Sequence, residues 1–159
     1  MTGEARYRCR AVGLGASRHG ELEPFGEVTD PRERARLLDK GLDDLARYWG
    51  GEFEPVPVQR PRIPVWVAGV WPHRRPLRRA ARWDGLFPIG MDGPDGLAEM
   101  AAQARALRAV GTPFDVITEI PPDDDPQRWA DAGATWVVTD FDRAPRELAV
   151  RDFIKHGWR

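Results

Sequence analysis

The densest group of side chains suited to binding an anion follows one short apolar segment. The apolar run 65–68 ends at Gly69, and Val70 and Trp71 lead from it into a stretch that carries Arg74, Arg75, Arg78 and Arg79. Ligands of parallel sheets bind where strands end in loops, and guanidinium groups suit phosphate and carboxylate. We therefore place the candidate site in the loop after Gly69. The alternative for the arginines is an exposed, solvated helix face.

Two other groups of residues have the types needed for chemistry but not the full pattern. Gly13 and Gly15 follow a short apolar approach, as in a glycine turn after a strand, yet Arg18 occupies the place of the third glycine of a dinucleotide motif. His19 follows closely, but no residue nearby in sequence would orient it as a catalytic base. This segment is therefore typical of a tight turn.

The carboxylates of Asp123, Asp124 and Asp125 lie side by side in the sequence. A calcium loop would place ligands at alternating positions, and that spacing is absent here. Because Asp125 precedes Pro126, its position is better explained as a helix cap. We predict no metal site.

Alternating strands and helices must position these groups. Asp30 precedes Pro31, and Glu33 is spaced to reach back to the cap amide, which predicts a helix start. An apolar stripe at helical spacing follows, and Gly50–Gly51 ends it. The proline-rich segment 52–64 is predicted to be an extended connector. Further strands are expected at 65–68, 86–89, 114–120 and 135–141, with helices at 77–83, 96–109, 127–131 and 145–155.

Helices between successive strands predict an α/β fold with a parallel sheet. The chain has 159 residues, the size of one domain, so we treat 1–159 as a single unit. About five strands favour an open, doubly wound sheet, since a closed (β/α)8 barrel needs roughly 200 residues or more. The rival is a partial barrel, whose exposed edges would invite association.

The net charge, the cysteine count and the lengths of the apolar runs exclude several kinds of partner and site. The formal net charge is −1, so no global field draws the chain to nucleic acid or anionic lipid. The only cysteine is Cys9, which excludes an internal disulfide and a thiolate metal site. No run approaches the ~20 apolar residues of a membrane span, and the first residues lack the apolar core of a signal peptide. We expect a cytoplasmic protein.

Four segments in order resemble the luciferase-like monooxygenases, the flavin-dependent oxidoreductases related to bacterial luciferase. The first is Val12-Gly13-Leu14-Gly15, followed by Glu23-Pro24-Phe25-Gly26, and the second is the helix sequence from Asp30. The third combines Val67-Ala68-Gly69 with Ala80-Ala81-Arg82-Trp83-Asp84-Gly85, and the fourth is Ala132-Gly133-Ala134-Thr135-Trp136. The resemblance implies strands four to eight of a (β/α)8 TIM barrel, without the first three.

The resemblance also implies a cofactor and a substrate class. FMN or the deazaflavin coenzyme F-420 is expected, contacted by Gly13, Gly15, Gly69, Val70, Trp71 and Arg74, with a small molecule as substrate. The flavin would supply the redox chemistry. No catalytic acid or base is assigned, because in this family such groups often lie on the early strands. The alternative is a non-catalytic partial barrel that associates with itself or with another chain.

Overall fold

In a computed structural model that describes residues 10–12, 20, 22–141 and 143–158, the chain forms an α/β fold around a parallel sheet. The strands are β1 (Arg10–Val12), β2 (Val65–Val70), β3 (Gly85–Ile89), β4 (Asp115–Ile120) and β5 (Trp136–Thr139). Each pairs in parallel with the next, so the order in the sheet follows the order in the chain. The predicted parallel α/β arrangement is confirmed.

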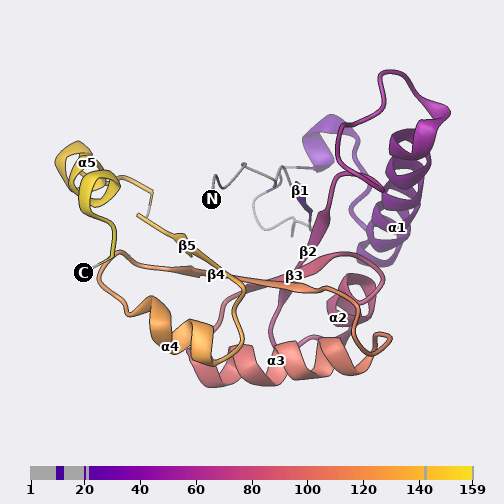
Figure 1. The fold of residues 1–159 in the computed structure, drawn as a ribbon. Coiled ribbons are helices and arrows are strands. Elements are labelled where there is room, and N and C mark those ends of the chain that lie inside the picture. Colours follow the sequence, from indigo (N-terminus) through magenta and orange to yellow (C-terminus); the bar gives the residue numbers. More distant parts are fainter. Residues whose placement is uncertain (1–9, 13–19, 21, 142, 159) are drawn as a thin grey trace.

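A helix follows each strand. These are α1 (Pro31–Arg47), α2 (Arg74–Ala80), α3 (Pro94–Ala106), α4 (Pro126–Asp131) and α5 (Glu147–His156), with a short 3-10 turn at Glu23–Phe25 before α1. In Figure 1, α2, α3 and α4 form a layer along one face of the sheet, and α5 stands apart at the β5 end. No helix in the described ranges is long and apolar enough to cross a membrane.

Two apolar clusters join the helices to one face of the sheet. In the first, Leu42 of α1, Leu77 of α2 and Met100 of α3 pack with Val67 and Leu86. In the second, residues of α3 and α4 pack with β4: Leu97, Ala101, Val116, Ile120 and Trp129. Helices α1 to α4 therefore cover a single face, and we call the opposite side of the sheet the open face.

The start of α1 follows the predicted cap in part. The Asp30 carboxylate accepts hydrogen bonds from the backbone N–H groups of Arg32 and Glu33, at 3.1 and 2.8 Å. Glu33 does not reach back to the cap, because its carboxylate is paired with Arg36 one turn further on. The helix passes into a π-turn at Tyr48–Glu52, where Gly51 adopts a φ of 121°. This left-handed conformation ends the helix at the predicted glycine pair.

Several element boundaries differ from the predictions. Strand β2 continues through Gly69 and Val70, so the predicted end of the strand at residue 68 is wrong and the loop begins after Val70. The helix expected from Leu77 already begins at Arg74, two residues after the proline of the cis Trp71–Pro72 peptide bond. In the predicted connector 52–64, Glu52 still belongs to the π-turn, and residues 53–64 have no helix or strand, as predicted.

The cap of α4 is confirmed. The Asp125 carboxylate accepts a hydrogen bond from the backbone N–H of Gln127 at 2.9 Å, and Pro126 occupies the first turn. Asp124 is engaged separately, since its carboxylate accepts from the indole N–H of Trp129 at 2.9 Å. These contacts give two of the three adjacent aspartates structural roles.

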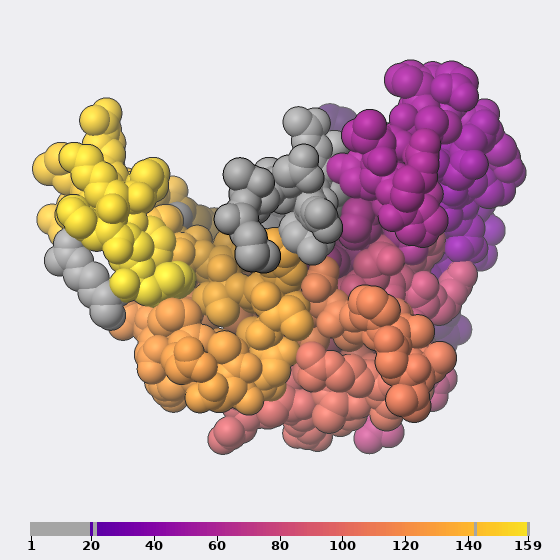
Figure 2. Space-filling view, viewed as in Figure 1, coloured from indigo at the N-terminus to yellow at the C-terminus, as the bar shows by residue number. Residues whose placement is uncertain are grey.

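The space-filling view shows how the ends of the sheet are built up. Helix α1 with the segment after it rises at one end, and α5 rises at the other, above the layer formed by β2–β5 and α2–α4 (Figure 2). Strand β5 is an edge of the described sheet.

Candidate functional site

The carboxyl ends of the parallel strands meet at one edge of the sheet, where α/β proteins place their ligands. Gly69 faces α2, so strand alternation turns its neighbour Val70 toward the open face. Val70 is in register with Ile89 of β3, and each is 47% exposed. On β5, Val138 is 41% exposed. Three strands thus present apolar side chains at the carboxyl end of the open face.

The amino half of the open face is aromatic and more closed. The rings of Trp66 and Trp136 pack with their centroids 5.7 Å apart. Trp66 is buried, and its indole N–H donates to the Asp115 carboxylate at 3.0 Å. The tryptophan pair therefore lies in the amino half of the open face, and the exposed aliphatic residues lie toward the carboxyl edge.

Glu119 is the ionisable group within this edge that sequence reasoning missed. It lies on β4 in register with Val138 of β5, and its neighbour Ile120 packs toward the helices, so Glu119 faces the open side. Partial desolvation raises the pKa of the Glu119 carboxyl, and the negative charge of Asp140 raises it further, although the residue as a whole is exposed. A carboxyl with a raised pKa at a strand's carboxyl end is a candidate proton donor or acceptor. The sequence signal was a glutamate near the carboxyl end of a strand, between Thr118 and Ile120.

The predicted site residues on β2 and its loop have contacts of their own. A side chain at Gly69 would meet Pro76 of α2, so the glycine permits close helix packing. The Trp71 amide donates to the Ile89 carbonyl at 3.4 Å, and the His73 amide donates to the Val70 carbonyl at 3.0 Å. The loop amides are therefore engaged within the protein. The Trp71 ring packs against the first apolar cluster.

The arginines after this loop divide into two groups. Arg79 forms a two-point contact with the Asp39 carboxylate of α1, and Arg82 pairs with Asp43 at 2.9 Å. The hydrogen bonds from Arg79 lower the pKa of Asp39 below its usual range. Within the described residues, Arg74, Arg75 and Arg78 are exposed and have no hydrogen-bond or ion-pair partner. Arg74 is thus available to an anion.

Two of the predicted cofactor contacts are not among the residues that the structure describes. Gly13 and Gly15, like His19, lie outside the described residues. Within the described part, no group of three or more histidine, cysteine, aspartate or glutamate side chains is arranged to hold a metal ion.

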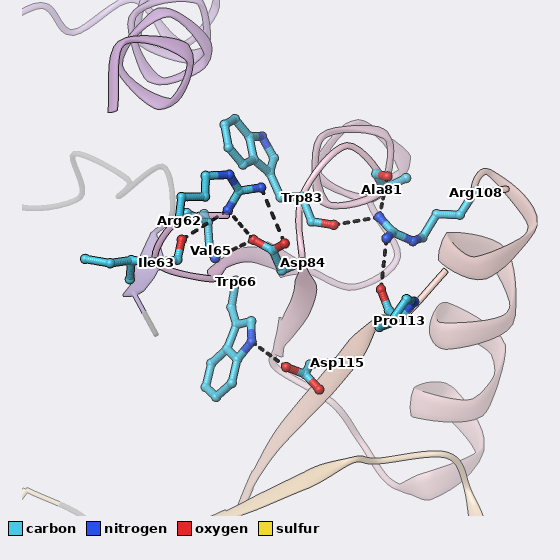
Figure 3. Close-up of polar contacts among 10 residues, drawn as sticks. All are labelled: Arg62, Ile63, Val65, Trp66, Ala81, Trp83, Asp84, Arg108, Pro113 and Asp115. Atoms are coloured by element: carbon cyan, nitrogen blue, oxygen red, sulfur yellow. Dashed lines mark hydrogen bonds and ion pairs between the residues drawn. The ribbon is translucent and has the colours of Figure 1, made fainter. Parts of the chain in front are cut away.

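The opposite, amino edge of the sheet holds a polar network that joins the connector to the strands (Figure 3). The Asp84 carboxylate accepts from the Arg62 guanidinium and, at 2.7 Å, from the Val65 backbone N–H. The Arg62 guanidinium lies 4.8 Å from the Trp83 ring centre. Asp84 belongs to the Trp83-Asp84-Gly85 part of the resemblance, so that motif has a structural role here. Amino-edge residues of such sheets generally serve stability.

Arg108 closes the same edge from the α3 side. Its guanidinium donates to the carbonyls of Ala81, Trp83 and Pro113, at 2.7, 2.6 and 3.0 Å, and so ties the loop between α2 and β3 to the loop between α3 and β4. Figure 3 shows these carbonyls converging on the arginine head group. The polar side chains at the amino edge therefore hold loops in place.

No protein-family model matches the chain, and no curated protein matches it with significance.

Proposed function

We propose that the chain is the later part of a luciferase-like (β/α)8 barrel and that its open face binds FMN or coenzyme F-420 in an oxidoreductase or monooxygenase reaction. The observation that supports this best is the topology: five parallel strands in chain order, with α1 to α4 on one face. A doubly wound sheet reverses its strand order and carries helices on both faces. A segment of a (β/α)8 barrel keeps its strands in chain order and carries helices on one face only.

The described residues fit a flavin in one respect and not in another. The apolar carboxyl edge formed by Val70, Ile89 and Val138 offers a surface for a planar ring. A backbone cradle for its phosphate does not fit, because the amides of Trp71 and His73 already donate to carbonyls and Pro72 has no N–H. The unpaired guanidinium of Arg74 is the better phosphate contact.

A bound flavin would supply hydride transfer or oxygen activation. The residues of this chain would orient the ring and exclude water from one side of it. Glu119, with its raised pKa, would hold or release a proton at its carboxyl oxygen. Its neighbour Asp140 would keep that carboxyl from ionising too readily.

Titration of the purified chain with FMN and with F-420, followed by their fluorescence, tests the proposal. Saturable binding of one cofactor is expected. Val70→Asp should weaken it roughly tenfold or more, because a charge would face the ring. Val110→Asp is the matched control, since Val110 is fully exposed in the turn between α3 and β4. If neither cofactor binds, the flavin role is rejected.

A second candidate is a non-catalytic partial barrel that associates with itself or with another chain. Strand β5 is a sheet edge, and the nearby α5 leaves Leu148 and Ile154 at 80% and 76% exposure. Such surfaces favour association. Sedimentation velocity over a range of concentrations separates the two: a monomer that binds flavin supports the first candidate, and a stable oligomer without flavin binding supports the second.

A further inference from the structure

Helix α2 carries more positive charge than its neighbours neutralise. Arg79 of α2, and Arg82 just after the helix, are paired with Asp39 and Asp43 of α1. On the other side of the helix, Arg74 and Arg78 have no ion-pair partner within the described residues. Because these two are four residues apart on a helix, their side chains share one face. That face is turned toward α3.

A groove of about 370 Å³ lies between this face and the end of α3. Arg74, Leu77 and Arg78 line it from α2, and Gln103, Ala106 and Leu107 line it from the α3 side. Leu77 is 2% exposed and forms part of the core, whereas Leu107 is 54% exposed. The groove thus combines two guanidinium groups with an aliphatic wall that is open to solvent.

One acidic residue is connected with the groove. The Gln103 side-chain amide donates to the Glu99 carboxylate at 3.1 Å, one turn earlier on α3. This contact orients Gln103 and leaves its carbonyl oxygen as an acceptor. The single charge of Glu99 stands against the two charges of Arg74 and Arg78, so the groove keeps an excess of positive charge.

We propose that this groove is a binding site for a small organic anion that carries a phosphate or carboxylate head on an apolar body. The guanidinium groups of Arg74 and Arg78 would together hold the oxyanion by charge-assisted hydrogen bonds. Leu107, Ala106 and Leu77 would contact the apolar part, whose burial adds to the affinity. The volume lies within the range of small-molecule sites, roughly 300–1,000 Å³.

The groove lies on the helical layer, whereas the flavin proposal concerns the open face. The two share Arg74, but Arg78 and Leu107 belong to the groove alone. Variants of these two residues therefore test the groove without touching Val70, Ile89 or Glu119.

Calorimetric titration of the full chain with hexyl phosphate, inorganic phosphate and hexanol tests the site. Hexyl phosphate should bind saturably and more tightly than either part alone. Arg78→Ala and Arg74→Ala should each weaken it roughly tenfold. Arg75→Ala is the matched control: it removes an equally unpaired charge from α2 that does not line the groove, and should change affinity by roughly twofold or less through screened charge alone.

Leu107→Asn examines the apolar wall and should weaken hexyl phosphate while leaving inorganic phosphate unchanged. Far-ultraviolet circular dichroism confirms that each variant is folded. Equal losses in Arg78→Ala and Arg75→Ala would mean diffuse charge attraction and would overturn the site, as would a lack of saturable binding. A chain that binds hexyl phosphate but no flavin supports the groove and rejects the flavin role; the reverse result rejects the groove.

Discussion

Gly69 of β2 lies directly against Pro76 of α2, so closely that a Cβ atom on the glycine would be 2.6 Å from the proline Cβ. Real Cβ atoms do not approach so near. The glycine therefore sets how closely α2 packs on the sheet. Its motif position had suggested an approach to a ligand, but the nearest neighbour is the protein's own helix.

Gly69→Ala should destabilise the fold by about 1–3 kcal/mol, because the added methyl group must displace the helix backbone that carries Pro76. Chemical denaturation measures the free energy of unfolding. Gly41→Ala is the control. Gly41 lies inside α1 with no atom near an added Cβ, so alanine there should stabilise by about 0.5–1 kcal/mol. Equal stability of the native chain and Gly69→Ala would contradict the packing role.

The Arg62–Asp84 pair should be coupled in stability. Asp84 accepts from both the Arg62 guanidinium and the Val65 amide, and the Arg62 side chain is only 19% exposed. Asp84→Asn should reduce the free energy of unfolding by about 1–3 kcal/mol. A double-mutant cycle with Arg62→Ala should give a coupling of roughly 0.5 kcal/mol or more.

The Asp43–Arg82 pair supplies the comparison for that cycle. Its two side chains are 57% and 55% exposed, on the surface between α1 and α2. Exposed pairs of this kind contribute about 0–1 kcal/mol. A coupling as large at Asp43–Arg82 as at Arg62–Asp84 would show that the amino-edge network has no special weight.

The order of elements could be read from the sequence, because apolar periodicity and helix caps are local signals. Asp30 before Pro31 and Asp125 before Pro126 each mark a helix start, and both carboxylates accept the expected amide hydrogen bonds. The end of β2 was predicted wrongly because it is decided by pairing with β3, which is not a local signal. A glycine usually signals a turn, but pairing of Gly69 with Pro88 and of Val70 with Ile89 keeps the chain extended.

The candidate site was harder to predict because it depends on which strands become neighbours. Glu119 gains its raised pKa from burial and from Asp140, which lies on the segment after β5. Likewise, the division of the arginines between α1 partners and the α3 groove depends on helix packing. Nothing within the local sequence distinguishes Arg79, which is bound to Asp39, from Arg78, which is not.

Asp39 should make the fold more sensitive to acid. Hydrogen bonds from Arg79 lower the pKa of Asp39 in the folded state below the ordinary value of 3.8. Its contribution to stability is therefore present above that value and is lost as the pH falls through the lowered folded-state pKa. Asp39→Asn should be less stable than the native chain at neutral pH, and the difference should shrink in strong acid. A difference that is constant with pH would contradict the pairing.

Glu119 should act in the opposite direction. Burial, and then the charge of Asp140, raise its pKa in the folded state above the ordinary value of 4.5. The favourable contribution of the protonated carboxyl is complete below about pH 4.5 and is lost as the pH rises through the folded-state pKa. Glu119→Gln should therefore be more stable than the native chain at neutral pH, with an advantage that disappears below pH 4.5.

The cause of the Glu119 shift can be separated by removing the second charge. Asp140→Asn should lower the pKa of Glu119, because the repulsion across β4 and β5 is gone, while the contribution from burial remains. The carbon chemical shift of the Glu119 carboxyl, followed by NMR through the titration, measures this directly. Asp123→Asn is a control on the α4 side, and Asp123 is absent from the causes of the shift. An unchanged titration of Glu119 in Asp140→Asn would assign the whole shift to burial and remove Asp140 from the candidate site.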